Sequence, residues 1–114
     1  MLKGLAGLGD MAKMMKAAQE MQGKMADLQA DLDHIIVLGE AGAGLVKARV
    51  TAKGDITGLD ISPHILVASE KEVVEDLIIA AIRDAQANAA ARSQQEMAKL
   101  AASMGLPTDL KLPF

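Results

Sequence analysis

The chain has 114 residues, of which 51% are apolar and one is aromatic, and it has no cysteine and a formal net charge of −3. This length favours one domain over residues 1–114, with residues 1–9 and 105–114 expected to be loosely ordered tails. The composition argues against a disulfide framework, a thiolate metal site, a membrane span and a generic polycation, and we expect a cytoplasmic protein.

The near absence of aromatic residues limits the core that this chain can build. Aromatic side chains bury the most area per residue, and a chain of this size buries only about two thirds of its unfolded surface. We therefore expect part of the apolar surface to be buried against a second subunit.

Residues 10–33 are predicted to form an amphipathic helix. Their apolar positions are alternately three and four apart over three heptads, which is typical of a helix that packs along one stripe. The stripe packs either onto the chain's own domain or onto another long helix, and its methionines make that surface adaptable. Its members are Met11, Met14, Ala18, Met21, Met25, Leu28 and Leu32.

Residues 34–68 change to a period of two, which indicates strands. Three antiparallel strands are predicted, in "HIIVLG", "LVKARVTA" and "DITGLDIS". The second has an apolar face and a polar face, namely Val46, Ala48 and Val50 against Lys47, Arg49 and Thr51. Such a small sheet must be covered by helices.

Two glycines are expected to shape these strands. Lys53 and Gly54 form a short hairpin turn between the second and third strands. Gly58 marks a bulge, because Ile56 is out of phase with Leu59.

The segment "GEAGAG" at residues 39–44 resembles a phosphate-binding loop. Known phosphate loops join a strand to a helix, whose N-terminus supplies a favourable dipole. Here a strand follows, and the Lys-Ser/Thr pair of a P-loop is missing. The glycines are therefore interpreted as a connection between strands that needs positive φ angles.

A second long helix is predicted from Ser69 to about Met104. Ser69 and Glu72 match a capping box, and Gly105 with Pro107 provides a stop signal. A helix of about 35 residues is roughly 50 Å long, whereas a seven-residue strand spans about 23 Å. The part near residues 86–104 is therefore expected to project beyond the sheet.

The topology predicts that this projecting part lies beside the first helix as an antiparallel arm. Residues 70–76 are acidic, whereas the basic side chains gather on the arm. Either these cations only face solvent, or they contact DNA phosphates, which requires charge and reach but no base-reading geometry. The cations are Lys3, Lys13, Lys16, Arg92 and Lys99.

No catalytic or metal site is predicted. His34 and His64, the only histidines, lie in no base–nucleophile pattern, and the acidic residues have no metal-ligand spacing. No cofactor is expected. DNA binding without aromatic residues to stack on bases should favour duplex and depend little on sequence.

The chain resembles the YbaB/EbfC family of bacterial nucleoid-associated proteins in three segments over about residues 10–105. These are "MAKMMKAAQEMQGKMADLQADL", "GEAGAGLVKARVTAKGDITGLDIS" and "VVEDLIIAAIRDAQANAAARSQQEM". One departure is Ala43, where the family often has a third glycine. The family has no catalytic motif, so the resemblance does not point to an enzyme.

The resemblance implies an α+β protein of order α-β-β-β-α that forms a tweezer-like homodimer. It implies binding of double-stranded DNA with little sequence preference, and a role in nucleoid organisation and gene regulation, with repair or replication proteins as further partners. Contacts through helical prongs would fall on the five cations named above. The alternatives are a scaffold that grips a partner protein through its Met-rich helix and prongs, and a small-molecule binder at the dimer interface.

Overall fold

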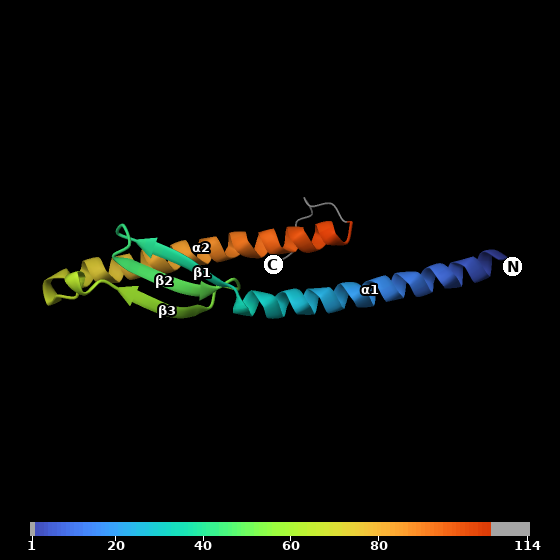
Figure 1. Cartoon of the computed structure of the whole chain (residues 1–114), viewed down its shortest axis with the longest axis horizontal. Helices are drawn as coiled ribbons and strands as arrows, with labels where there is room; N and C mark the ends of the chain where they lie inside the picture. The colour runs from blue at the N-terminus through green and yellow to red at the C-terminus, as the bar shows by residue number, and fades with distance from the viewer. Residues whose placement is uncertain (1, 106–114) are drawn as a thin grey trace. The chain divides into compact units, whose positions relative to one another are not determined.

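The protein, in a computed structural model, is described over residues 2–105, with side chains from residue 8 onwards. The elements in chain order are α1 (Leu2–His34), β1 (Ile36–Ala41), β2 (Val46–Thr51), β3 (Ile56–Ile61), the 3-10 turns η1 (Pro63–Ile65) and η2 (Ala68–Glu70), and α2 (Lys71–Ser103) (Figure 1). This order confirms the predicted α-β-β-β-α fold.

Contacts between residues divide the chain into two compact units, Met1–Ala30 and Asp31–Phe114, which are described separately. The prediction of one domain over residues 1–114 stays a prediction, as does the antiparallel arm. Helix α1 already begins at Leu2 within the expected N-terminal tail. Met1 and residues 106–114 lie outside the described residues.

The first unit contains α1 up to Ala30, and the apolar stripe of this helix changes in exposure along its length. Met11 and Met14 are exposed, Met21 and Met25 are half-buried, and Leu28 is buried. The exposed methionines are a surface that this unit does not cover by itself. No helix within the described residues is long and apolar enough to cross a lipid bilayer.

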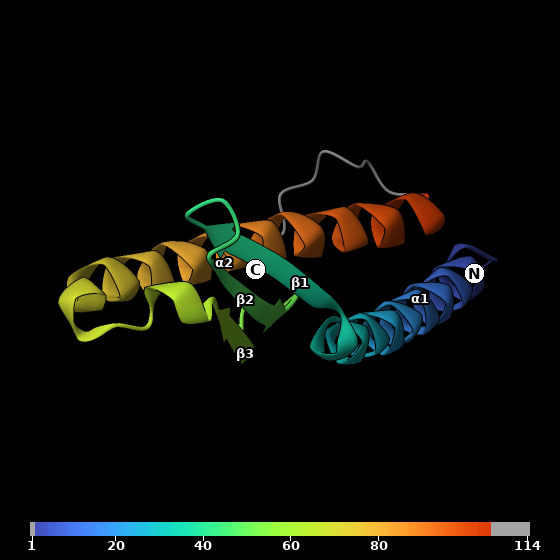
Figure 2. The same cartoon turned by 60° about the vertical axis from the view of Figure 1, so that its left-hand side comes forward.

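The second unit contains an antiparallel sheet in which β2 lies between β1 and β3 (Figure 2). Directly paired residues share a face, so the pairs Val37–Val50, Gly39–Ala48 and Ala41–Val46 all point to one side. On β2 this side carries Val46, Ala48 and Val50, which are fully buried as the alternation predicts. Thr51 lies on the other face, as predicted, and is also buried, with its hydroxyl accepting a hydrogen bond from the Asp55 amide in the following turn (3.2 Å).

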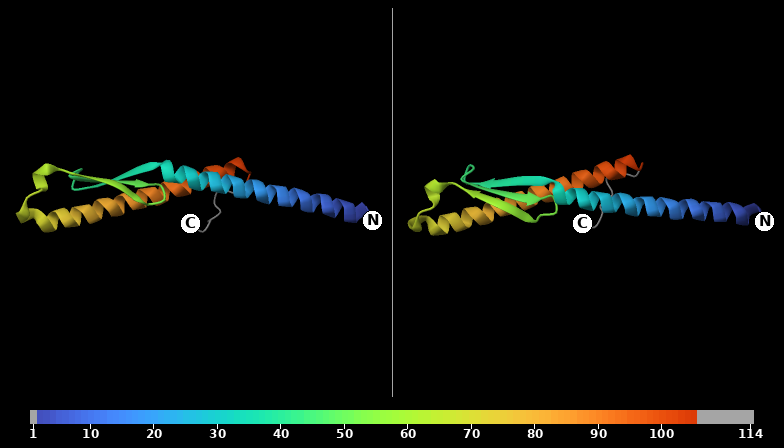
Figure 3. Two further views of the ribbon diagram at one scale, coloured as in Figure 1. Left: turned by 90° about the horizontal axis from the view of Figure 1, so that it is seen from below. Right: turned by 60° about the horizontal axis from the view of Figure 1, so that its bottom comes forward.

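Helix α2 covers this face, mainly over β1 and β2 (Figure 3). Ala81, Ala85 and Ala89 are one helical turn apart, lie on one side of α2 and are fully buried. Such small side chains bring the helix axis close to the sheet. At Gly39 the approach is so close that a Cβ would collide with the backbone of Ala85 and the carbonyl oxygen of Ala81.

Strand β3 is less covered than β1 and β2. Arg49 pairs with Gly58 and Val50 pairs with Ile56, so Thr57 has no counterpart, and this register shift confirms the predicted bulge. A Cβ at Gly58 would collide with the Arg49 guanidinium. Ile56 and Leu59 of β3 remain exposed although they share a face with the core.

The segment 39–44 contains the last three residues of β1 and the first three residues of the connection to β2. Gly42, Ala43 and Gly44 have φ angles of 64°, 55° and 88°, three successive left-handed residues. The chain then enters β2, so no helix follows the loop. This confirms the interpretation as a strand connection with positive φ angles for Gly42 and Gly44, whereas Gly39 is a residue of β1.

The start of α2 differs from the prediction, but its end does not. Helix α2 begins at Lys71 with Glu70 as its N-cap, and no side chain caps it, so the predicted Ser69–Glu72 capping box is wrong. Ser69 instead lies within η2, where the Glu70 amide donates to the Val67 carbonyl (2.9 Å). At the other end Gly105 has a φ of 75° and ends the helix as predicted.

Polar contacts tie the ends of these elements together. The Ala52 amide donates to the carbonyl oxygens of Ile35 (2.9 Å) and Leu32 (3.2 Å), which joins the last turn of α1 to the β2–β3 hairpin. Ser93 of α2 donates to the Ala52 carbonyl (2.6 Å). This is the last described hydrogen bond from α2 to the sheet side, so the contact continues to Ser93 and does not end near Gln86 as predicted. Figure 3 shows the C-terminal end of α2 extending past the strands.

Substituting Gly39 with Ala should destabilise the protein by about 3 kcal/mol or more, because the backbone of Ala85 cannot yield to a methyl group as a flexible side chain could. Urea unfolding measures this change. The matched control is Gly23→Ala, which meets no neighbour within 4 Å and should stabilise α1 by about 1 kcal/mol. Equal small effects at both positions would contradict the close packing.

Substituting Ala43 with Gly should stabilise the protein by roughly 0.5–1 kcal/mol. Left-handed backbone costs an alanine about 1–2 kcal/mol, and the extra freedom that glycine brings to the unfolded chain offsets only part of this. Thermal unfolding of the two proteins measures the difference. A lower melting temperature for the glycine variant would show that Ala43 is not strained.

Candidate nucleic-acid interface

The described lysine side chains of α1 lie along one side of the first unit. Lys13 and Lys16 are both exposed and lie one turn apart, so they can present their ammonium groups together. Lys24 is also exposed and lies about three turns from Lys13 on the same side. Lys24 was not among the five predicted contacts, although its spacing from Lys13 places it on the same side of the helix. Lys3 lies in α1, but its side chain is outside the described side chains.

One acidic residue lies among these lysines. Glu20 is four residues from both Lys16 and Lys24 and is exposed on the same side of α1. The methionine stripe follows another side of the helix, as its different heptad positions require. Between Lys13 and Lys24 the polar surface of α1 therefore carries more positive than negative charge, and the exposed Asp27 and Asp31 make its C-terminal end acidic. The apolar surface is separate.

The cations of α2 are held together by an acidic residue between them. The Glu96 Oε1 atom accepts hydrogen bonds from Arg92 Nε (3.0 Å) and Lys99 Nζ (3.2 Å). The Glu96 side chain is 19% exposed, whereas those of Arg92 and Lys99 are 44% and 71% exposed. The three side chains together carry a single positive charge at the surface of α2.

This arrangement also keeps the acid ionised. The hydrogen bond from Arg92, and then that from Lys99, lowers the pKa of Glu96 below its ordinary value. Whatever stability the cluster adds is therefore present above the ordinary glutamate pKa and is lost as the pH falls through the lowered one. At neutral pH both cations face a full negative charge.

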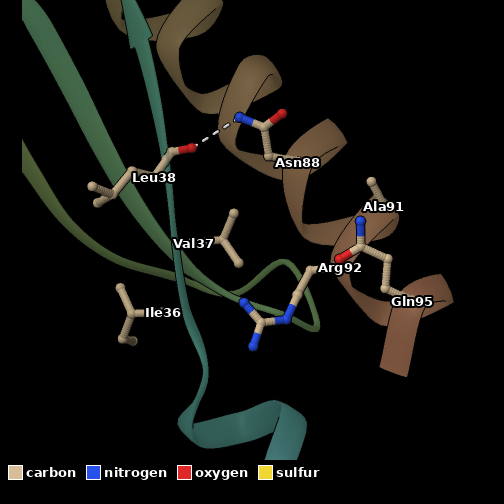
Figure 4. Close-up of a pocket in the computed structure, with 7 residues that line it drawn as sticks. All are labelled: Ile36, Val37, Leu38, Asn88, Ala91, Arg92 and Gln95. Atoms are coloured by element: carbon tan, nitrogen blue, oxygen red, sulfur yellow. Dashed lines mark hydrogen bonds between the residues drawn. The ribbon is translucent and has the colours of Figure 1, made fainter. Parts of the chain in front are cut away.

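Arg92 also lines a broad groove between α2 and the free edge of β1, with a volume of about 480 Å³. Figure 4 shows the guanidinium extending toward the strand from the helix. The groove contains exposed apolar side chains but no histidine or carboxylate, so it has no acid–base pair. Its lining residues are Ile36, Val37, Leu38, Asn88, Ala91, Arg92 and Gln95.

Polar side chains of α2 close part of this β1 edge. The Asn88 side chain donates to the Leu38 carbonyl (2.9 Å), as drawn in Figure 4, and the Glu40 amide donates to Asp84 Oδ2 (2.9 Å). These bonds satisfy backbone groups that an edge strand otherwise offers to another chain. The edge is thus partly protected from pairing with a further strand.

Among the described residues, the histidines and acidic side chains do not form a catalytic or metal-binding site. His34 ends α1 and His64 lies in η1, and both are exposed. Within the described residues, His, Asp and Glu side chains nowhere gather in threes as a metal ion would require. Among the acids of the 70–76 segment, Glu75 pairs with Lys71 at 3.7 Å.

Of the five predicted contacts, the structure brings Arg92 and Lys99 together around Glu96, and it places Lys13 and Lys16 one turn apart on α1. Glu96 was visible in the sequence, but its role as the shared partner of both cations was not predicted. The spacing of four and three residues on a helix could have indicated it.

The sequence of this chain is similar to those of known proteins over nearly its whole length. The model of the YbaB/EbfC DNA-binding family matches residues 7–104. A nucleoid-associated protein of Rhodopseudomonas palustris (strain HaA2) is 46% identical over 105 residues, which are 92% of this chain and 99% of the relative. The nucleoid-associated protein GOX0603 of Gluconobacter oxydans (strain 621H) is 43% identical over 113 residues, which are 99% of this chain and 100% of the relative.

A solved structure shares the fold. The crystal structure of HP0035 from Helicobacter pylori superposes with a TM-score of 0.61 at 19% identity, covering 80% of this chain and 91% of the other. From the family match over nearly the whole described chain and the similarity to these relatives, the chain belongs to the YbaB/EbfC DNA-binding family.

Proposed function

We propose that this protein is a nucleoid-associated protein, not an enzyme, which binds duplex DNA with little sequence preference through cations of its two long helices. The observation that carries the proposal is the exposure of Lys13, Lys16, Arg92 and Lys99 on long helices in a chain whose family binds DNA. Lys24 extends the lysine row of α1, and Lys3, which lies in the first turn of that helix, is a further proposed contact. Contacts of this kind position a protein on phosphates without reading bases.

The proposal includes a homodimer with helical prongs that acts at the nucleoid in the cytoplasm. The exposed apolar residues support a partner subunit, because Met11, Met14 and Leu59 lie uncovered within their own units. A dimer also doubles the number of cations that meet one duplex. Nucleoid organisation, gene regulation and contacts with repair or replication proteins follow from the same proposal.

The charge distribution of the protein leads us to expect a weak affinity for DNA. The net charge is −3, and Glu20 and Glu96 lie among the proposed contacts. Neutralising each phosphate releases counterions and adds about 0.9 to the slope of log K against log salt. Binding to DNA should therefore be strongest at low ionic strength. At high salt the cations in solution compete with the protein for the phosphates.

A second candidate function is a scaffold that holds a partner protein. The exposed Ile36 and Leu38 of the β1 groove favour it, because apolar patches beside arginine are common in protein interfaces. Burial of apolar surface depends little on salt, whereas phosphate contacts depend on it steeply. Salt dependence therefore separates the two functions.

The combined substitution of Lys13 and Lys16 with Glu should weaken DNA binding roughly tenfold or more at low salt, because two phosphate contacts become repulsions. Fluorescence anisotropy of a labelled duplex measures the affinity, and circular dichroism checks that α1 remains helical. The control is Lys47→Glu with Lys71→Glu, which changes the net charge equally at exposed positions on β2 and at the start of α2. Equal losses in both variants would move the site away from α1.

A further inference from the structure

The contact of two proposed DNA-binding cations with one glutamate has a functional consequence. We propose that Glu96 limits the affinity for DNA by competing with phosphate for Arg92 and Lys99, an inference that rests on the proposed function. In the absence of DNA, the Glu96 carboxylate takes the place that a phosphate oxygen would occupy. A phosphate that approaches these cations meets a negative charge already in place.

The geometry favours competition between Glu96 and phosphate. One oxygen atom, Glu96 Oε1, accepts from both Arg92 Nε and Lys99 Nζ, at 3.0 and 3.2 Å. Carboxylate and phosphate oxygens use the same donors of arginine and lysine in the same geometry. The two cations are much more exposed than Glu96, so a phosphate can reach them from solvent.

The hydrogen bonds leave part of the arginine unused. Arg92 contacts Glu96 through Nε alone, and the described contacts include no hydrogen bond from its two Nη groups. A guanidinium has five N–H donors, so those of the Nη groups remain for a phosphate. The cluster can therefore bind DNA with Glu96 in place, but at reduced strength.

Competition outweighs any orienting role that Glu96 has. At about 4 Å in a largely aqueous setting, one unit charge changes the binding constant of a phosphate roughly fivefold. Glutamine in place of Glu96 keeps an oxygen that accepts from both cations, so it removes the charge while retaining the orientation. The net effect of the natural carboxylate is thus to weaken binding.

The test compares Glu96→Gln with the wild-type full chain in binding a labelled duplex of mixed sequence at several salt concentrations. Glu96→Gln should bind about fivefold more tightly at low salt, with a salt slope steeper by up to about 0.9. Adding Arg92→Gln and Lys99→Gln should abolish this gain. The matched control is Glu75→Gln, which removes the same charge from an ion pair in the first turns of α2.

Each outcome decides the inference. Weaker binding of Glu96→Gln would show that the carboxylate positions the cations, and an equal gain in Glu75→Gln would show an effect of net charge alone. Unchanged binding of Glu96→Gln beside a wild type that binds DNA would overturn the inference and leave the proposed function intact. If neither Glu96→Gln nor the wild type binds DNA at low salt, the inference and the proposed function are both overturned.

Discussion

The close approach of α2 to the sheet at Gly39 is the constraint on which the second unit depends. The Ala85 backbone lies where a Cβ of residue 39 would be, and Ala81 and Ala89 continue the same contact one turn to either side. This packing fixes the rotation of α2 about its axis. It thereby places Asp84 and Asn88 on the β1 edge, and it directs the cluster around Glu96 to a defined side of the helix.

The same constraint accounts for a core built almost without aromatic side chains. A helix that touches the strands through alanine leaves no room for large rings between the two layers, and the buried side chains of β2 are correspondingly small. Small side chains bury little apolar area. The exposed apolar residues on α1, β1 and β3 supply the surface that a partner subunit can use.

Much of this fold could be predicted from the sequence because it depends on local patterns. The alternation of Val46, Ala48 and Val50 indicated the buried face of β2, and the phase change at Gly58 indicated the bulge. The absence of a helix after residues 39–44 excluded a phosphate loop. Features that depend on tertiary contacts were not accessible, since nothing in the sequence shows that Gly39 faces Ala85.

One local signal failed for a physical reason. Ser69 and Glu72 have capping-box spacing, but the 3-10 turn at residues 68–70 changes the backbone that such a box requires. Thr51 lies on the polar face of β2 as the alternation indicated, and the adjacent hairpin turn satisfies its hydroxyl and allows it to be buried. At the proposed site, the basic residues were visible in the sequence, while the side chain that both Arg92 and Lys99 contact became clear only from distances.

A protein with an acidic net charge can bind DNA if the cations of its helices act together and the binding remains electrostatic. The most direct measurement is the salt dependence of affinity for two duplexes of unrelated sequence. If about 4–6 phosphates are neutralised, log K should fall with log salt at a slope near −4 to −5, equally for both duplexes. No binding at low salt, or a preference of about a thousandfold for one sequence, would contradict the account.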